Sequence, residues 1–219
     1  MNIRPVRTRI FKEGESLATF VKAHVKKIPE KTVLVVASKI VALSEGRSTK
    51  HPGVRQKPRL TVTDGMVMAN AGIDESNANG KIILLPKNSY KSAERLRKEL
   101  KKMYRIKNLC VIVSDSHLAP LRAGVTAHAL GYAGVVGIRD YRGKKDLFGR
   151  TMKISRTNVA DSLATAAALE MGEGAERQPL ALITEAPVAF AEKINQKETH
   201  ISLFDDIYGP LLKTIRKNP

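Results

Sequence analysis

The chain has 219 residues, 42 % of them hydrophobic, which is enough to bury a sizeable core. Its net charge of +17 favours anionic partners such as nucleotides, polycarboxylates or nucleic acid. It contains no apolar run long enough to cross a bilayer, and no apolar stretch follows its basic N-terminus as in a secretory signal. We therefore expect a cytoplasmic protein in which residues 1–219 form a single domain, with room for a smaller lobe.

The apolar pattern predicts alternating helices and strands in chain order. The predicted elements are a helix over 15–27, a buried strand over 32–38, a charged loop over 46–59, a strand pair turning at Asp64 and Gly65, a strand over 81–86, a basic helix over 92–104 and a strand over 108–115. A glycine-rich stretch over 122–143 precedes a helix over 161–172 capped by Gly172, a buried strand over 179–184 and a proline-interrupted helix over 204–215. This order predicts a mixed α/β (α+β) fold with mixed sheets and packed helices.

Two features of these elements bear on function. The single cysteine, Cys110, excludes an internal disulfide and is interpreted as a buried strand thiol, because no base lies near it in sequence. The basic helix over 92–104 has the apolar spacing of an amphipathic helix. Its cations are interpreted as a solvated face rather than a nucleic-acid groove, because no aromatic residues are interleaved with them.

Two candidate sites lie near the first buried strand and in an Asn-rich loop. Ser38 and Lys39 follow that strand and could bind phosphate. An ordinary strand-to-helix boundary explains the same residues equally simply. The sequence GxxxxGK[ST] is absent, which excludes a P-loop. The loop ANAGIDESNANG concentrates Asn70, Asp74 and Asn77 as substrate-binding candidates. Turn chemistry explains many of its Asn and Gly residues, and an EF-hand is rejected because the later acidic ligand is missing.

A third candidate site follows the strand over 108–115. Asp115 stands at the end of a buried strand, where an α/β protein places a carboxylate that binds Mg²⁺ or Mn²⁺. Arg122 can pair with phosphate or carboxylate and is a catalytic candidate. His117 and His128 are interpreted as surface or satisfied residues rather than ligands, since their spacing does not fit zinc.

A fourth stretch, DYRGKKDLFGR, presents several cations beside two glycines, Arg142 and Lys145 among them. It is either a charged hairpin loop or a loop that binds an anionic substrate.

Taken in order, ASKIVALSEGR, ANAGIDESN, SAERLRKEL, VIVSDS, RAGVTAHALGYAG, DYRGKKDLFGR and NVADSLATAAALEMGEG resemble the coenzyme F-420:L-glutamate ligase family from about Phe11 to Ala181. The resemblance implies a homodimer that forms γ-glutamyl amides with GTP or ATP and Mg²⁺ or Mn²⁺, through an acyl phosphate of the acceptor. It assigns metal binding to Asp115 and Asp161 and nucleotide contacts to Thr8, Arg9, Ile10, Phe11, Ser38 and Lys39.

The chain departs from the family pattern in several places. Leu43 replaces a lysine before the EGR sequence, SDSHLAPLR replaces S-D-T-x-G-R-x-x-R, Arg156 stands near an expected acidic metal position, and Ser162 replaces the glutamate of VADE. The resemblance implies the deazaflavin F-420 precursor as acceptor, and these departures leave a folate open as the alternative. Both carry a free carboxylate, and each reactant is an anion that a basic protein attracts. The alternative outside this class is a basic nucleic-acid-binding protein on a degenerate ligase scaffold.

Overall fold

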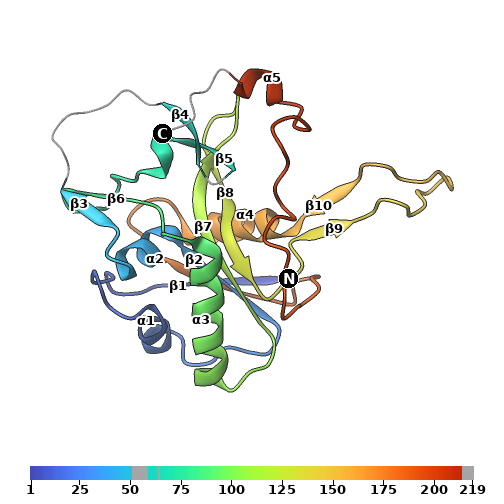
Figure 1. Ribbon diagram of the computed structural model, residues 1–219. Helices are drawn as coiled ribbons and strands as arrows, with labels where there is room; N and C mark the ends of the chain where they lie inside the picture. The colour runs from blue at the N-terminus through green and yellow to red at the C-terminus, as the bar shows by residue number, and fades with distance from the viewer. Residues whose placement is uncertain (51–58, 64, 214–219) are drawn as a thin grey trace.

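A mixed sheet forms the centre of the protein in the computed structural model, which describes residues 1–50, 59–63 and 65–213 (Figure 1). Its strand order is β1-β11-β2-β7-β8, with β2 and β7 parallel and the other neighbours antiparallel. The strands are β1 (Asn2–Val6), β2 (Thr32–Ala37), β7 (Leu109–Leu118), β8 (Val125–Ala133) and β11 (Leu180–Thr184). Apolar residues alternate between two buried faces in β2, as expected for a strand covered on both sides.

Helices cover both faces of this sheet. The helices are α1 (Leu17–His24), α2 (Ser38–Ser44), α3 (Ser89–Tyr104), α4 (Val159–Met171) and α5 (Gly209–Leu212). Figure 1 shows α3 in front of the sheet and α4 behind it. One core joins α1 and α3 to the sheet through residues such as Phe20 and Leu100, and a second joins α4 through Leu163 and Ala164. The alanines of α4 allow it to pack closely on β8.

Among the described residues, three two-stranded sheets extend from this body. They pair β3 (Ser48–Lys50) with β6 (Lys81–Ile83), β4 (Leu60–Thr63) with β5 (Met66–Ala69), and β9 (Ile138–Asp140) with β10 (Arg156–Asn158). A short 3₁₀ helix, η1 (Asn70–Gly72), follows β5. Residues 138–158, here named the β9–β10 arm, project away from the body (Figure 1). No helix among the described residues is long and apolar enough to span a membrane.

The predicted α+β class is confirmed, and so is the buried thiol of Cys110, whose pKa is raised by burial. The predicted strands over 32–38, 81–86, 108–115 and 179–184 correspond to β2, β6, β7 and β11. The strand pair around residue 64 is also present, although Asp64 itself lies outside the described residues. Gly172 caps α4 with φ of 77°.

Helix boundaries differ from the prediction where local capping decides them. α1 begins at Leu17 because the Ser16 hydroxyl accepts from the backbone N–H of Thr19, and it ends at His24, before the extended Val25 enters the core. α3 begins at Ser89 because Asn88 caps it through the N–H of Lys91. The last predicted helix is wrong in extent, since only Gly209–Leu212 is helical among its described residues.

Strands also form in one predicted loop and in the glycine-rich stretch, to which the sequence analysis assigned no element. The glycine-rich stretch over 122–143 forms β8 and β9, and the charged loop over 46–59 contains β3; its residues 51–58 lie outside the described part of the chain. β8 is buried along most of its length, and its glycines serve close packing: a side chain at Gly131 would lie 2.4 Å from the backbone nitrogen of Tyr90 in α3. A β-bulge between Val113 and Ser114 resets the register so that Asp115 lies directly opposite His128.

Candidate active site

The candidate site forms where α2 meets the end of β7. Ser38 is the first residue of α2, and its hydroxyl donates a 2.7 Å hydrogen bond to Oδ1 of Asp115. β2 and β7 run parallel in register, with Ala37 beside Ser114, so the residues that follow on both strands meet at one edge of the sheet. The structure thus brings together the first and third candidate stretches of the sequence.

The Asn-rich loop reaches the same place through Lys39. The Lys39 ammonium lies 2.9 Å from Oδ2 of Asp74 and donates to the carbonyl oxygen and hydroxyl of Ser76 at 2.6 and 3.0 Å. Asp74 Oδ1 accepts from the backbone N–H and hydroxyl of Ser76 at 2.8 and 2.7 Å. Lys39 is 22 % exposed at its side chain, so its charge is held in a defined place while still open to a ligand.

The loop after α4 contacts both β7 and the Asn-rich loop. The Ser116 hydroxyl lies 2.9 and 2.8 Å from the two carboxylate oxygens of Glu173, and the Asn77 side chain donates to the carbonyl of Gly174 at 3.1 Å. Ser116 and Glu173 were missed as site residues by the sequence analysis. The MGEG sequence that contains Glu173 was the available signal, but nothing in one sequence placed it beside β7.

Asp115 is a carboxylate in an unfavourable environment for its own charge. Burial and the nearby Asp74 raise its pKa to about 6, although the Ser38 hydrogen bond, the Ser116 backbone and Lys39 act in the opposite direction. A carboxylate held in this way is stabilised as an anion by any cation that approaches it. This observation fits a divalent metal bound at Asp115.

His128 lies across from Asp115 on β8, on the same face of the sheet. It is buried, at 8 % exposure, and its Nε2 has no hydrogen-bond partner among the described residues. Its ring lies 5.0 Å from that of His117 in an edge-on contact. Burial and His117 lower the pKa of His128 to about 4, so the ring is neutral at pH 7. The expectation of a surface or satisfied histidine is therefore wrong for His128.

An unpaired buried polar nitrogen ordinarily costs about 1 to 3 kcal/mol, so its presence beside Asp115 is consistent with a ligand-binding site.

Asp161 has structural partners in this conformation. Its two carboxylate oxygens accept from the backbone N–H of Ala129 at 2.8 Å and from the Asn158 side chain at 2.6 Å, at the start of α4. Burial raises its pKa. No cluster of three or more His, Cys, Asp or Glu side chains in the described part of the chain is arranged to hold a metal by itself. The assignment of Asp161 as a metal ligand stays a prediction.

The other candidates in these stretches lie apart from the Ser38–Asp115 contact. Asn70 stands in η1 with φ of 51°, and its side-chain oxygen accepts from the backbone N–H of Arg59. That bond orders the loop around β4 and β5. Arg122 is exposed in the turn that joins β7 to β8, beyond Leu118.

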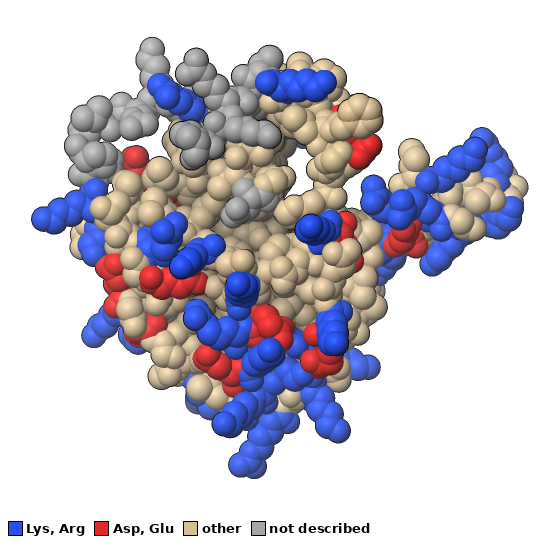
Figure 2. Space-filling model, viewed as in Figure 1, with Lys and Arg blue, Asp and Glu red and all other residues tan. Residues whose placement is uncertain are grey.

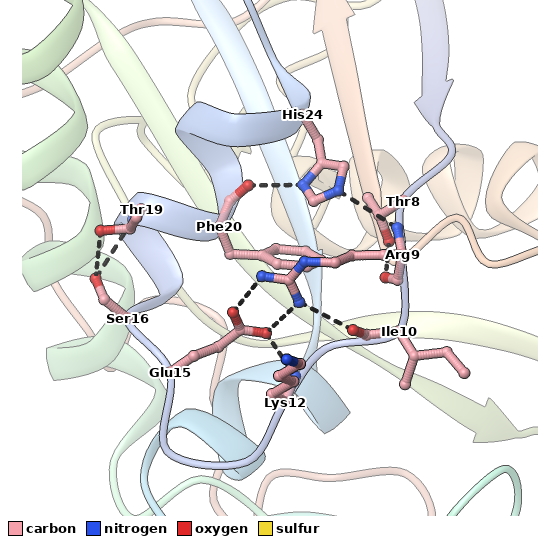
Figure 3. A network of polar contacts seen from close by, with 9 residues as sticks. All are labelled: Thr8, Arg9, Ile10, Lys12, Glu15, Ser16, Thr19, Phe20 and His24. Carbon is pink, nitrogen blue, oxygen red and sulfur yellow. Dashed lines mark hydrogen bonds and ion pairs between the residues drawn. The ribbon is translucent and has the colours of Figure 1, made fainter.

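The segment from Thr8 to Phe11 docks onto α1 (Figure 3). The Arg9 guanidinium lies over the Phe20 ring, 5.0 Å from its centroid, and donates to Glu15 at 2.8 Å. His24 Nε2 accepts from the Arg9 backbone N–H at 3.3 Å. Phe11 is buried, Ile10 is exposed and the Thr8 hydroxyl donates to the carbonyl of Arg9. The contacts drawn in Figure 3 fix this segment against α1.

The β9–β10 arm carries the fourth stretch away from the site. Figure 2 shows it as a mostly basic extension. Its Lys and Arg residues are Arg139, Arg142, Lys144, Lys145, Arg150, Lys153 and Arg156, against Asp140 and Asp146. Arg142 pairs with Asp140 at 2.6 Å and helps lower its pKa to about 2, while Lys145 donates to Thr151. The arm is a charged hairpin, and the binding of an anionic substrate by Arg142 and Lys145 stays a prediction.

Residues 53–185 match the family described as F420-0:Gamma-glutamyl ligase, and these residues include most of the site described above. The chain belongs to this family. Proteins named "Coenzyme F420:L-glutamate ligase" are similar to it. One from Methanococcus maripaludis (strain C7) is 41 % identical over 74 % of this chain and 66 % of its own length. One from Methanopyrus kandleri is 34 % identical over 82 % of this chain and 84 % of its own.

The relative from Methanocaldococcus jannaschii is 44 % identical over 58 % of this chain and 50 % of its own length. The matched region also covers less than two thirds of the length of three Methanococcus maripaludis relatives, at 66 %, 60 % and 62 %. Both Ser38 and Lys39 lie before the region that matches the F420-0:Gamma-glutamyl ligase family, whereas Asp74, Asp115 and Glu173 lie inside it.

Proposed function

We propose that this chain is a nucleotide- and divalent-metal-dependent γ-glutamyl ligase that adds L-glutamate to the carboxylate of a coenzyme acceptor. The observation that carries the proposal is the convergence of Ser38, Lys39 and Asp115 at one sheet edge, in a chain of the F420-0:Gamma-glutamyl ligase family. The acceptor is the deazaflavin F-420 precursor or a folate, and the phosphoryl donor is GTP or ATP.

A carboxylate is a poor acyl electrophile, so amide formation needs prior activation. In the proposed reaction an acceptor carboxylate oxygen attacks the γ-phosphorus of the nucleotide. The bond from that phosphorus to the bridging oxygen breaks, leaving an acyl phosphate and the nucleoside diphosphate. The amine of glutamate then attacks the acyl carbon, phosphate leaves and the amine loses a proton. Lys39 supplies a fixed positive charge near the transferred group, and Ser38 holds the Asp115 carboxylate in one orientation.

A divalent cation fits this site because Asp115 is a half-buried carboxylate with no cation in direct contact among the described residues. On the neighbouring strand, the buried Nε2 of His128 has no hydrogen-bond partner among those residues either. When bound, Mg²⁺ or Mn²⁺ would neutralise charge that develops on the transferred phosphoryl group. Asp115 would hold it, and nucleotide oxygens and water would complete its coordination, as is usual for Mg²⁺ sites with few protein ligands.

One assay tests the proposal directly. The purified chain is incubated with L-glutamate, Mg²⁺ or Mn²⁺, GTP or ATP, and either the F-420 precursor or a folate, and products are followed by mass spectrometry. The expected result is addition of one or more glutamyl residues with release of one nucleoside diphosphate each. If no nucleotide is consumed with either acceptor while RNA or DNA binds with a steep salt dependence, the nucleic-acid-binding alternative replaces this proposal.

We also propose that the protein is a homodimer, with the β9–β10 arm as the contact. Leu147 and Phe148 are 98 % and 89 % exposed and adjacent at the tip of the projecting arm, where a second chain would bury both. Because the arm and the whole chain are both basic, salt should strengthen this contact by screening repulsion.

Replacing both tip residues, Leu147→Ser with Phe148→Ser, should convert the dimer to a monomer in light scattering coupled to size exclusion. Leu169→Ser removes a leucine of α4 that is 84 % exposed and should leave the mass unchanged. A monomeric parent chain, or a double variant that stays dimeric, would contradict this role of the arm.

A further inference from the structure

We propose that His128, through Nε2, is a second protein ligand of the divalent metal at Asp115 and that it biases the site toward Mn²⁺ over Mg²⁺. The inference rests on the proposed function, because that function brings the metal to Asp115. It adds a residue from β8 that no motif in the sequence indicated and that lies on a different strand from Asp115.

The position of His128 is fixed by the sheet. Asp115 and His128 are register partners across the antiparallel pair β7–β8, so their side chains leave the same face from neighbouring backbones. Directly opposed residues have Cβ atoms about 4.5 to 5.5 Å apart, a separation from which a carboxylate and an imidazole can reach one ion. The β-bulge at Val113 and Ser114 sets this pairing, because it shifts the register just before Asp115.

The chemistry of the nitrogen supports a metal rather than a structural role. Nε2 is buried and unpaired within the described part of the chain, whereas buried ring nitrogens are normally hydrogen-bonded. An imidazole offers a lone pair on Nε2 when its proton sits on Nδ1, which is the form that binds metals. The groups facing it across the pair are His117 and Asp115, and neither bonds to this nitrogen.

The metal preference follows from the donor types. Mg²⁺ takes oxygen ligands almost exclusively, whereas Mn²⁺, the first member of the first-row divalent transition series, binds oxygen ligands and also accepts an imidazole nitrogen. One carboxylate and one imidazole leave the remaining positions to phosphate oxygens and water. Such a site agrees with the absence, within the described ranges, of a cluster of three or more protein ligands.

Pulsed electron paramagnetic resonance of bound Mn²⁺ tests the inference without measuring activity. The full chain is loaded with Mn²⁺ alone and with Mn²⁺ plus GTP, and the echo modulation from directly bound ¹⁴N is recorded. Protein made with ¹⁵N-histidine assigns the modulation to a histidine. The expected result is a nitrogen coupling that changes with the isotope in the parent chain and disappears in His128→Phe, which keeps ring bulk without nitrogen.

A titration gives the thermodynamic counterpart. His128→Phe should weaken Mn²⁺ binding about tenfold or more while changing Mg²⁺ affinity, measured by competition, much less. His117→Phe is the matched control, because it removes the other histidine of the same ring pair and should keep both the coupling and the Mn²⁺ affinity. His128→Gln serves as a second variant if circular dichroism shows that His128→Phe fails to fold.

Three outcomes overturn the inference. If Mn²⁺ binding depends on Asp115 but shows no histidine coupling, His128 is not a ligand. The proposed ligase function is unaffected by that result. A coupling that is lost in His117→Phe and kept in His128→Phe would show that the ligand is His117 of β7 and not His128 of β8. A chain that binds no Mn²⁺ with or without GTP contradicts both this inference and the metal-dependent function.

Discussion

Asp115→Asn is expected to abolish ligation while making the metal-free protein more stable at neutral pH. The substitution keeps the side-chain shape and an acceptor for the Ser38 hydroxyl, but it removes the negative charge that holds the metal. Loss of several kcal/mol of charge stabilisation in the transition state corresponds to at least about a 10³-fold fall in kcat/KM.

The stability effect follows from the raised pKa of Asp115, about 6 in the folded chain against an ordinary value near 3.9. A raised folded pKa favours the protonated form, so its contribution to stability is fully present below about pH 4 and lost as the pH rises through 6. Two pKa units correspond to about 3 kcal/mol at pH 7.5. In EDTA, Asp115→Asn should therefore melt at higher temperature than the parent chain at pH 7.5 and at the same temperature near pH 4.

Ser38→Ala is the matched control for the stability effect, because it removes a hydrogen bond that lowers the pKa of Asp115. It should destabilise the metal-free chain at pH 7.5, in the opposite direction to Asp115→Asn. Full ligase activity of Asp115→Asn would contradict the metal assignment. Equal melting temperatures of that variant and the parent at pH 7.5 would contradict the burial argument.

Lys39→Met should have the second-largest effect on activity. If the ammonium faces the transferred phosphoryl group, its removal costs stabilisation that is realised in the transition state, so kcat should fall about 10²-fold or more. The Met side chain has similar length, and the 22 % exposure of Lys39 leaves room for it. Steady-state kinetics with GTP and with ATP, together with nucleotide affinity by calorimetry, separate an effect on kcat from one on binding.

Asp74→Asn distinguishes this role from simple anchoring of the loop. It breaks the 2.9 Å ion pair with Lys39 but leaves the ammonium and its bonds to Ser76. If Lys39 acts on phosphate, Asp74→Asn should lose much less kcat than Lys39→Met. Equal losses in the two variants would show that Lys39 serves mainly to hold the Asn-rich loop against α2.

The sequence determined the main elements and three of the stretches that meet at the site. β-Branched runs such as that from Thr32 to Ala37 indicate buried strands in any context, because their side chains fit a sheet covered on both faces. A polar residue directly after such a strand, as at Ser38, reaches the edge where parallel strands end. The order of the motifs was sufficient for the family, because each motif is a local pattern.

The sequence did not determine which stretches lie together. DYRGKKDLFGR and the Asn-rich loop are both polar stretches that contain glycines, yet one extends along the β9–β10 arm while Asp74 of the other bonds to Lys39. A hairpin makes the same local hydrogen bonds whether it folds back onto the protein or projects outward. The local sequence therefore does not predict its direction. The difference arises from long-range packing.

The sequence also did not predict which side chains from other elements contact β7. Glu173 meets Ser116 because α4 packs against β8 and ends beside β7, which is a property of the sheet and its helix layer. His128 meets Asp115 because a bulge shifts the pairing of β7 and β8, and a shift of one residue would have sent the imidazole to the opposite face. The sequence by itself thus determined the buried apolar run that leads into Asp115, although β7 continues to Leu118. Only the tertiary structure decided which side chains surround that carboxylate, because register and layer packing depend on contacts between residues far apart in the chain.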